Sequence, residues 1–334
     1  TIPNLDEVLF GNLASAFNNG AVLGVSWTDQ KAGEKPRRAS VLNPEPDYDL
    51  TDDDEIIVLK GIDSPLERVD LDSFSSWEEP PEREITRPNV KKVLILAYNA
   101  NLGLIVSELA KHAASDISVV VACADAKSSE ALVRARYSDL LSGHLTLSFT
   151  EFDLAEAWRL DGIRPWEFDV IFIVADEVDK TIDADSKTIM LLLLLGEIEN
   201  KQNNGAFPPV VAELLNSESK QLCVGTPLTD AIVSTEILSI QLAQLVREPF
   251  LETLYKELLN AGGIEIGLRP IEHYVKLGVS VSIAGITRSA LRYNEIALGY
   301  RSVQDGVKIN PSKDQLCVFE EGDLLIVLAQ QVYT

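Results

Sequence analysis

Short apolar runs alternate with helical segments through the middle of the chain. The runs, rich in Val, Ile and Leu, are residues 92–97, 117–123, 145–149, 170–174 and 210–213. Helical patterns lie between them, over 102–113 and 128–141. Continuous apolar strands separated by helices are typical of a parallel sheet covered on both faces. The pattern therefore predicts a Rossmann-like α/β domain over about residues 90–220.

A second pattern recurs at the two ends of the chain and predicts a pair of small α+β lobes. Each copy has a predicted helix, then a strand containing glycine, an Asn-Pro turn, an acidic turn and a closing apolar strand. The helices are 5–17 and 283–293, and the matching blocks are 22–25, 42–44 and 53–59 in the first copy and 297–300, 309–311 and 321–327 in the second. Pro fixes φ, while Asn, Asp and Gly tolerate tight turns, so these residues separate the strands. We expect both copies to share one fold.

Proline and helical spacing suggest the remaining boundaries. Pro65, Pro80, Pro81 and Pro88 stand among many acidic residues, which favours an exposed connector. Helical stretches over 229–246 and 249–260 carry apolar residues that should pack within the chain or on a partner subunit; these are Ile237, Ile240, Leu242 and Leu245. The predicted organisation is a lobe (1–62), a linker (63–90), the Rossmann-like domain (91–228), a helical connector (229–262) and a second lobe (263–334).

Composition removes several classes of function. A formal net charge of −23 argues against a nucleic-acid partner, because such binding needs Lys and Arg to displace counterions. Cys123, Cys223 and Cys317 have no disulfide or zinc spacing, which suits a reducing compartment. The longest apolar run, 189–195, is too short to span a bilayer, so any membrane anchor should lie outside this chain.

The turn after the first parallel strand does not favour nucleotide binding. A dinucleotide fingerprint needs several glycines there, but residues 97–103 offer only Gly103, and Tyr98 adds bulk where a phosphate would need room. Asp125, after the second strand, is the one candidate for a ribose ligand. The histidines, His112, His144 and His273, stand in no catalytic motif, so the sequence predicts no enzyme activity.

Two acidic clusters are candidates for a cation site, because Ca²⁺ takes six to eight oxygen ligands, often from short acidic loops. The first is Asp47, Asp49, Asp52, Asp53, Asp54 and Glu55, and its alternative reading is a solvated turn. The second follows a parallel strand, at the sheet edge where α/β folds bind ligands; it comprises Asp176, Glu177, Asp179, Asp183 and Asp185. Alternatively, Asp185 and Ser186 cap a helix beginning near Thr188.

Several of these segments resemble the Castor/Pollux family of ion channels, whose tandem cytosolic domains are called RCK domains (regulators of potassium conductance, TrkA-like). The resemblance spans about residues 90–330 and is carried by 175–177, 184–188, 190–194, 210–214, 295–301 and 309–311. It implies a Rossmann-like RCK domain flanked by two RCK C-terminal lobes, the first being the end of a preceding RCK unit. It also implies a pore region upstream, a homotetramer with a ring of eight such domains, and a connector that forms the dimer contact.

From the resemblance and the residues together we expect a cytoplasmic, ligand-sensing gating-ring domain of a cation channel, membrane-associated through its pore. Ca²⁺ is the candidate ligand, at the acidic clusters above. Two alternatives remain open: a nucleotide-dependent oxidoreductase built on the Rossmann-like domain, and a structural assembly module without a ligand.

Overall fold

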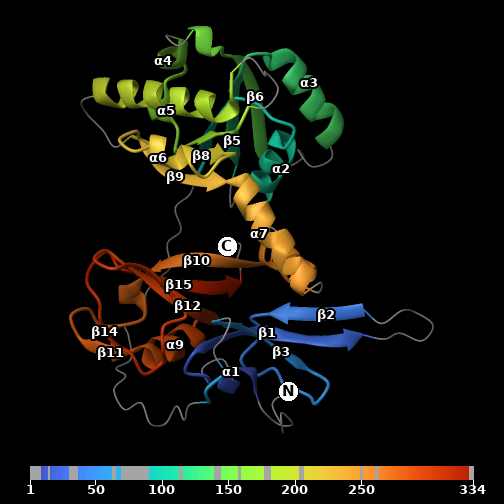
Figure 1. Ribbon diagram of the computed structural model, residues 1–334, viewed down its shortest axis with the longest axis vertical. Coiled ribbons are helices and arrows are strands. Elements are labelled where there is room, and N and C mark those ends of the chain that lie inside the picture. The colour runs from blue at the N-terminus through green and yellow to red at the C-terminus, as the bar shows by residue number, and fades with distance from the viewer. Residues whose placement is uncertain are drawn as a thin grey trace. The chain divides into compact units, whose positions relative to one another are not determined.

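The computed structural model of the chain divides into two compact units, residues 1–86 with 250–333, and residues 87–249 (Figure 1). The structure describes residues 9–13, 16–29, 37–61, 65–68, 90–112, 116–138, 144–156, 159–176, 182–202, 207–248, 251–259 and 263–330. We take each unit by itself, beginning with the second.

The second unit contains a six-stranded parallel sheet in the order β6-β5-β4-β7-β8-β9. Its strands are β4 (Lys92–Leu96), β5 (Ile117–Cys123), β6 (Leu145–Glu151), β7 (Val170–Ile173), β8 (Val210–Leu214) and β9 (Leu228–Val233). Its helices are α2 (Leu102–His112), α3 (Ala126–Tyr137), α4 (Arg159–Ile163), α5 (Ala184–Lys201), α6 (Ser219–Leu222) and α7 (Ser234–Arg247), with 3₁₀ turns η2 (Leu154–Glu156) and η3 (Pro165–Glu167). The predicted Rossmann-like α/β fold is confirmed.

Helices cover both faces of this sheet, which explains why its strands are apolar throughout. Leu102 and Val106 of α2, with Val133 of α3, belong to one buried cluster. Leu191 and Leu195 of α5 belong to another. A strand buried on both faces can place apolar side chains at every position, as the sequence pattern indicated.

One predicted element is wrong. Residues 229–233, expected to begin a helix, belong to the edge strand β9, which pairs in parallel with β8. The hydroxyl of Thr229 accepts the backbone N–H of Val210 at 3.0 Å. An edge strand needs less apolar surface than an inner one, so Thr229 and Asp230 concealed the strand pattern. The helix α7 begins only at Ser234.

The first unit holds both copies of the repeated pattern. The first lobe contains α1 (Phe10–Leu13), β1 (Gly20–Asp29), β2 (Arg37–Leu42) and β3 (Glu55–Lys60), in sheet order β2-β1-β3. The helix α8 (Leu251–Leu259) precedes the last lobe. The last lobe contains β10 (Ile264–Pro270), the 3₁₀ turn η4 (Ile271–His273), β11 (Ser280–Ser282), α9 (Ile283–Leu291), β12 (Glu295–Ser302), β13 (Gly306–Ile309), β14 (Leu316–Val318) and β15 (Leu324–Gln330). Its main sheet has the order β10-β15-β12-β13, and β11 pairs with β14.

The two predicted lobe helices differ in outcome. Residues 283–293 were expected to form a helix, and α9 occupies Ile283–Leu291. Of the helix expected over 5–17, only Phe10–Leu13 is helical among the described residues, and Phe17 forms a β-bridge with Arg68. Residues 5–8, 14 and 15 of that prediction lie outside the described residues.

The repeated residues have the same backbone geometry in both lobes. Gly24 faces Leu42 across β1 and β2, and Gly299 faces Ile309 across β12 and β13. Each glycine also stands at a β-bulge against the closing strand. A Cβ on either glycine would lie 2.1 Å from a carbonyl oxygen of the neighbouring strand, which only glycine avoids.

The Asn-Pro turns also correspond. Asn43 N–H donates to the Leu23 carbonyl and Asn310 N–H to the Leu298 carbonyl, both at 2.7 Å. Both asparagines have positive φ, 42° and 50° respectively, a region that Asn tolerates better than most residues. The sequence repeat is therefore a repeat of structure.

The lobes pack together through a joint core and reciprocal hydrogen bonds. One buried cluster contains Val22, Val25 and Leu42 of the first lobe with Leu298 and Leu328 of the last. The side-chain amide of Asn43 donates to the carbonyl of Asn294 at 2.6 Å. In return, the amide of Asn310 donates to the carbonyl of Asn19 at 2.8 Å. Such an exchange of roles is what an approximate two-fold relation between the lobes produces.

Candidate functional site

The strand order places a candidate binding site at the carboxyl ends of β4 and β7. These strands are neighbours, but the chain continues from β4 toward β5 and from β7 toward β8, on opposite sides. The connections therefore diverge, and α/β folds bind ligands in the crevice that such a divergence leaves. We name this region, the turn 97–101 with residues 174–176 and Glu213, the switch-point edge.

A carboxylate ties the switch-point edge together. Glu213 of β8 accepts the side-chain amide of Asn99 at 2.9 Å and the backbone N–H of Ala175 at 3.0 Å, through the same oxygen. Asn99 is only 3% exposed, and its own side-chain oxygen accepts the N–H of Asn101 at 3.0 Å. An anionic ligand entering here would meet a carboxylate already bound to both turns. The network therefore joins the turn after β4, the segment after β7 and the strand β8 by hydrogen bonds.

The residues around the first turn are occupied by packing. A Cβ on Gly103 would lie 2.2 Å from the ring of Tyr137, so this glycine allows α2 to approach α3. Tyr98 is half-buried and packs against the buried cluster that contains Leu102 and Val106 of α2. Burial, followed by the nearby Cys123, raises the pKa of Tyr98, which keeps its hydroxyl neutral. Gly103 thus serves helix packing.

Asp125, the candidate ribose ligand, is the N-cap of α3. Its carboxylate accepts the N–H of Ser128 at 3.1 Å, and hydrogen bonds from Ser128 lower its pKa. The side chain is exposed at the carboxyl end of β5. One of its oxygens is thus used locally, and its role toward a nucleotide stays a prediction.

The second acidic cluster is divided among protein partners. The helix expected near Thr188 begins at Ala184, and its cap is Asp183, whose carboxylate accepts the N–H of Ser186 at 3.0 Å. The prediction that Asp185 caps it is wrong, because Asp185 lies inside the first turn. Asp185 is 4% exposed, and its two oxygens accept the N–H groups of Leu215 and Asn216 at 2.7 and 2.9 Å.

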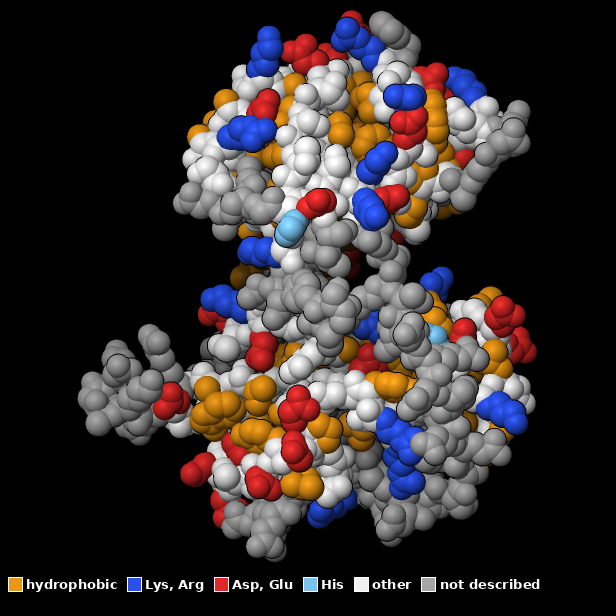
Figure 2. All heavy atoms as spheres, turned by 180° about the vertical axis from the view of Figure 1, so that it is seen from behind, with side chains coloured by type: hydrophobic (Ala, Val, Ile, Leu, Met, Phe, Trp, Pro, Cys, Tyr) orange, Lys and Arg blue, Asp and Glu red, His pale blue; other side chains and the backbone are white. Residues whose placement is uncertain are grey.

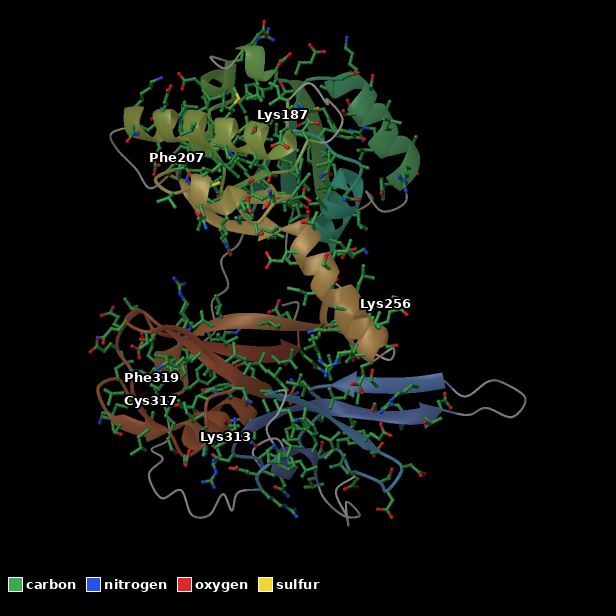
Figure 3. The ribbon with its side chains drawn as sticks, in the orientation of Figure 1. Lys187, Phe207, Lys256, Lys313, Cys317 and Phe319 are labelled. Atoms are coloured by element: carbon green, nitrogen blue, oxygen red, sulfur yellow. The ribbon has the colours of Figure 1, made fainter. Side chains whose placement is uncertain are left out.

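Asp176 lies close to a buried cation. Lys187 of α5, labelled in Figure 3, is 4% exposed. Its ammonium lies 3.3 Å from the Asp176 carboxylate. Glu177 and Asp179 fall outside the described residues. Within the described ranges, no three His, Cys, Asp or Glu side chains converge as a metal site would require. Asp176, Asp183 and Asp185 each serve a different partner.

The first acidic cluster forms a turn with one inward-facing acid. Asp54 is buried, and one of its oxygens accepts both the N–H and the hydroxyl of Thr51, at 2.9 and 3.1 Å. Glu55 forms an ion pair with Arg38. The other acids of the cluster are exposed: Asp47, Asp49, Asp52 and Asp53. On the face that Figure 2 shows, acidic side chains are likewise spread over both units.

Buried polar groups in the last lobe were not predicted. Glu295, 4% exposed, accepts Arg269 Nε at 3.3 Å and the hydroxyl of Tyr274. Burial, followed by the charge of Glu295, strongly raises the pKa of Tyr274. These contacts join β10 to β12 and hold the tyrosine neutral. Arg269 also donates to Glu265 at 3.2 Å, so the set links three side chains of the lobe to Arg269 and stabilises the lobe.

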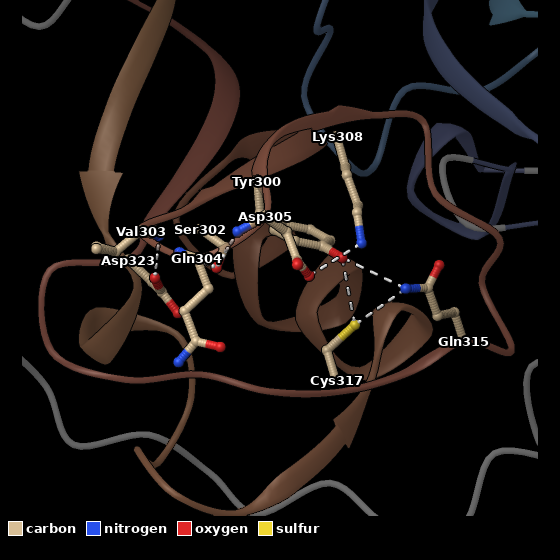
Figure 4. Close-up of polar contacts among 9 residues, drawn as sticks. All are labelled: Tyr300, Ser302, Val303, Gln304, Asp305, Lys308, Gln315, Cys317 and Asp323. Carbon is tan, nitrogen blue, oxygen red and sulfur yellow. Dashed lines mark hydrogen bonds and ion pairs between the residues drawn. The ribbon is translucent and has the colours of Figure 1, made fainter.

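A second polar group in this lobe surrounds Tyr300 (Figure 4). Its hydroxyl accepts the side-chain amide of Gln315 at 3.3 Å and the thiol of Cys317 at 3.7 Å. Lys308 lies over the ring, 5.8 Å from its centre, and also binds Asp305 at 3.2 Å. Burial raises the pKa of Tyr300, and the hydrogen bond with Cys317 raises it further. We find no nucleophile and base paired for catalysis in this group.

Sequence reasoning missed the residues that connect the switch-point edge. Glu213 could have been noticed, since it is the one acid within an apolar parallel strand, Val210–Leu214. Lys187 is similarly a charge within the apolar helix α5. Asn99 carried no signal of its own, because asparagine is ordinary in a turn.

Comparison with known proteins reveals sequence relatives among ion channels. The chain is 24% identical to "Probable ion channel POLLUX" of Arabidopsis thaliana over 365 residues, covering 98% of this chain and 43% of that protein. It is 22% identical to "Ion channel DMI1" of Medicago truncatula and 23% identical to "Ion channel CASTOR" of Lotus japonicus. Each match covers 98% of this chain, with 40% and 41% of the relative. The chain thus spans less than half the length of these relatives.

Other comparisons add less. No protein-family model matches the chain. Among solved structures, a GsuK channel described as bound to NAD covers 98% of this chain and 48% of its own, with 12% identity and a TM-score of 0.31. A second GsuK structure gives 11% identity and a TM-score of 0.32, covering 98% and 49%. These TM-scores are too low to equate the arrangements.

Among the helices that the structure describes, none has the length and apolar character needed to cross a membrane. The segments that resembled Castor/Pollux channels all fall within the matched region. Over nearly all of its length, this chain is therefore a relative of the Castor/Pollux ion channels.

Proposed function

We propose that the chain is a cytosolic regulatory region of a cation channel, which senses a ligand and passes its binding to a pore. The observation that carries the proposal is the match of 98% of the chain to proteins described as ion channels. A Rossmann-like sheet whose connections diverge at its switch-point edge is suited to ligand recognition. We place the pore in the part of the protein upstream of Thr1 and propose a homotetramer.

The switch-point edge is where we propose that a ligand acts. A ligand shifts a conformational equilibrium only if it binds one state better than the other. At this edge, Glu213 holds the turn after β4 to the backbone after β7, through Asn99 and Ala175. A ligand that takes over one of these contacts changes the relation of the two turns. A coupling of about 1–3 kcal/mol between ligand and pore is typical of such devices.

Two ligand classes deserve direct tests. Dinucleotides bind Rossmann-like folds in this crevice, so NAD⁺ is one probe. Ca²⁺ is the other, because Asp176 of the second acidic cluster lies at the same edge. Since Asp183 and Asp185 already bind backbone N–H groups, a calcium site here would depend on Asp176 with Glu177 and Asp179. Calcium binding stays a prediction.

A structural assembly module is a second candidate, favoured by α7. This helix has no buried residue, and its apolar side chains Leu238, Ile240 and Leu242 are 57%, 51% and 54% exposed. Such a surface fits a subunit contact. The module would form a defined oligomer without responding to any ligand.

Thermal unfolding of the purified chain separates these functions. A ligand that binds only the folded chain raises Tm with concentration. For the regulatory proposal, NAD⁺ or CaCl₂ raises Tm, Glu213→Gln or Asp176→Ala reduces that rise, and no metabolite is turned over. Glu218→Gln, an exposed change after the same strand, should leave the rise unchanged.

The opposing outcomes are distinct. A stable oligomer by light scattering, with no rise of Tm from either ligand, favours the assembly module. Reduction of NAD⁺ by any metabolite in the presence of the chain favours the oxidoreductase. Either result contradicts the regulatory proposal as stated.

A further inference from the structure

The first and last lobes have corresponding strands but different edges. β2, β1 and β3 of the first lobe match β13, β12 and β15 of the last, with bulges at Gly24 and Gly299. In the last lobe a further strand, β10, pairs with β15. Among the described residues of the first lobe, β3 pairs only with β1, so its outer edge has no strand partner.

Burial follows this difference. In β15, residues 325–329 are all buried. In β3, residues 56–59 are half-buried. Val58 faces Val22 across β3 and β1, as Val327 faces Ala297 across β15 and β12. Val327 is fully buried, whereas Val58 is half-buried. An edge strand with four consecutive apolar residues and, among the described residues, no strand partner on its outer side is a template for another strand.

A helix makes the second difference between the lobes. α8, which precedes the last lobe, packs on β2 of the first lobe. The Glu257 carboxylate accepts the N–H of Leu42 at 3.2 Å and the hydroxyl of Ser40 at 3.3 Å. Leu254 and Leu258 of α8 pack against the joint core. Leu42, at the end of β2, is consequently fully buried.

In the part of the chain that the structure describes, the matching strand of the last lobe, β13, is exposed. Ile309 corresponds to Leu42 and is 51% exposed, and Val307 corresponds to Ser40 and is 60% exposed. Because Asn310 N–H binds the Leu298 carbonyl, the Ile309 N–H points away from β12, as the Leu42 N–H points away from β1. Leu42 donates outward to Glu257, and Ile309 presents the same geometry.

Sequence spacing indicates which segment would cover these surfaces. Ile283 N–H donates to the Gln315 carbonyl as Phe10 N–H donates to the Tyr48 carbonyl, both at 3.0 Å, so Ile283 and Phe10 correspond. α8 begins at Leu251 and β10 at Ile264, which are 32 and 19 residues before Ile283. The same spacings before Phe10 fall upstream of Thr1. The sequence relatives are more than twice as long as the region they share with this chain.

We propose that the residues immediately upstream of Thr1 in the complete protein supply a helix that packs on β13 and a strand that pairs antiparallel with β3. This helix places apolar side chains over Val307 and Ile309, as Leu254 and Leu258 of α8 pack near β2. It also places an acceptor side chain at the Ile309 N–H, as Glu257 accepts the Leu42 N–H. Each lobe would then have a strand on the outer edge of its closing strand, as β10 pairs with β15, and a helix on its second strand, as α8 packs on β2. This inference does not depend on the channel function.

Hydrogen exchange tests the proposal by comparing the full-length protein with residues 1–334. Amides in β3 and at Ile309 should exchange at least about tenfold more slowly in the full-length protein, since pairing and burial slow local opening. Amides of β15 and Leu42, already covered, should be protected in both. Equal exchange of β3 and Ile309 in the two proteins overturns the proposal. So does protection that appears in residues 1–334 alone as concentration rises, because a second copy would then be the occupant.

A pair of substitutions gives an independent test. Ile309→Glu should lower Tm of the full-length protein and leave Tm of residues 1–334 nearly unchanged. Leu316→Glu, at a 64% exposed position in the same lobe, is the matched control and should change neither. If Ile309→Glu lowers Tm equally in both proteins, or in neither, the upstream helix does not cover β13.

Discussion

The turn after each Asn-Pro pair shows what the two lobes share and where they part. Pro46 and Lys313 occupy the same place, because the Pro46 carbonyl accepts the N–H of Gly11 and the Lys313 carbonyl accepts the N–H of Ala284, both at 2.9 Å. The backbones are alike. Lys313, however, which Figure 3 labels, is 1% exposed and carries an amine into the interior. Its Nζ donates to the Thr287 hydroxyl at 3.2 Å.

This contrast separates two kinds of residue in the repeat. Residues that determine the backbone, such as Gly24 with Gly299 and Asn43 with Asn310, are the same in both copies. Residues whose side chains meet local surroundings differ, as Pro46 differs from Lys313 and Leu42 from Ile309. The repeated residues should therefore have equal effects when changed, and the divergent ones unequal effects.

Replacing the bulge glycines should have the largest effect. Gly24→Ala and Gly299→Ala each place a Cβ 2.1 Å from a backbone oxygen, which cannot move without disturbing the sheet. We expect each to lower the free energy of unfolding by about 3 kcal/mol or more. Gly162→Ala, where nothing lies within 4 Å of the added Cβ, is the control. Denaturant unfolding measures all three, and a mild effect at either bulge would show that the lobes are not equivalent there.

The buried lysine should give the next largest effect, and one that depends on pH. Burial lowers the pKa of Lys313 from 10.5 to about 8. Between those values the unfolded chain binds a proton that the folded chain does not, so the free energy of unfolding rises with pH across this window. The rise should be about 3 kcal/mol. In Lys313→Met this contribution should be absent, and the variant should be more stable than wild type below pH 8.

Other groups that titrate at alkaline pH contribute equally to the stability of wild type and of Lys313→Met, so the difference between the two proteins isolates Lys313. Lys127→Met, a change at an exposed lysine in the second unit, should retain the wild-type dependence on pH. If wild type and Lys313→Met unfold with the same pH dependence from 8 to 10.5, Lys313 is charged in the folded protein.

The two reciprocal asparagines should have smaller, matched effects. Asn43→Ala and Asn310→Ala each remove a donor to a carbonyl of the other lobe and place Ala at positive φ. We expect each to cost about 1–3 kcal/mol. Glycine at either position retains the backbone conformation, so the Gly variants isolate the hydrogen bond. Markedly unequal costs for the two positions would break the two-fold relation.

The smallest effect should come from the acidic turns. Both hydrogen bonds of Asp54 go to one oxygen, which an asparagine can keep, so Asp54→Asn should cost under about 0.5 kcal/mol. Asp323, its counterpart, uses both oxygens: one accepts the N–H of Val303 at 2.9 Å (Figure 4), and the other accepts the N–H of Glu320 at 3.0 Å. Asp323→Asn should therefore cost about 1 kcal/mol. Equal costs in denaturant unfolding would contradict this distinction.

Sequence alone predicted the elements whose signal is local. The strand 117–123 was predicted with the bounds that the structure gives it, Ile117–Cys123, because both of its faces are buried and every position could be apolar. The repeat was visible because Asn-Pro and glycine are needed for the backbone itself. The edge strand Leu228–Val233 escaped because it mixes polar and apolar residues and runs directly into a helix.

The contacts of the candidate site were beyond sequence reasoning because they join distant residues. Asn99 and Glu213 are 114 positions apart, and Ala175 and Glu213 are 38 apart. Even the local prediction at Asp185 was wrong by two residues, since the cap is Asp183. Helix ends are poorly defined by a run such as Asp-Ala-Asp-Ser, in which either Asp could cap.

Current recorded from the full-length protein in excised patches tests the central claim, that this chain regulates a channel through a ligand. The cytosolic face would be exposed in turn to NAD⁺ and to CaCl₂, in wild type and in Glu213→Gln. We predict that open probability changes with at least one of them, and that Glu213→Gln reduces the change. An absence of ion current from the full-length protein, or a current indifferent to both ligands, would contradict the account.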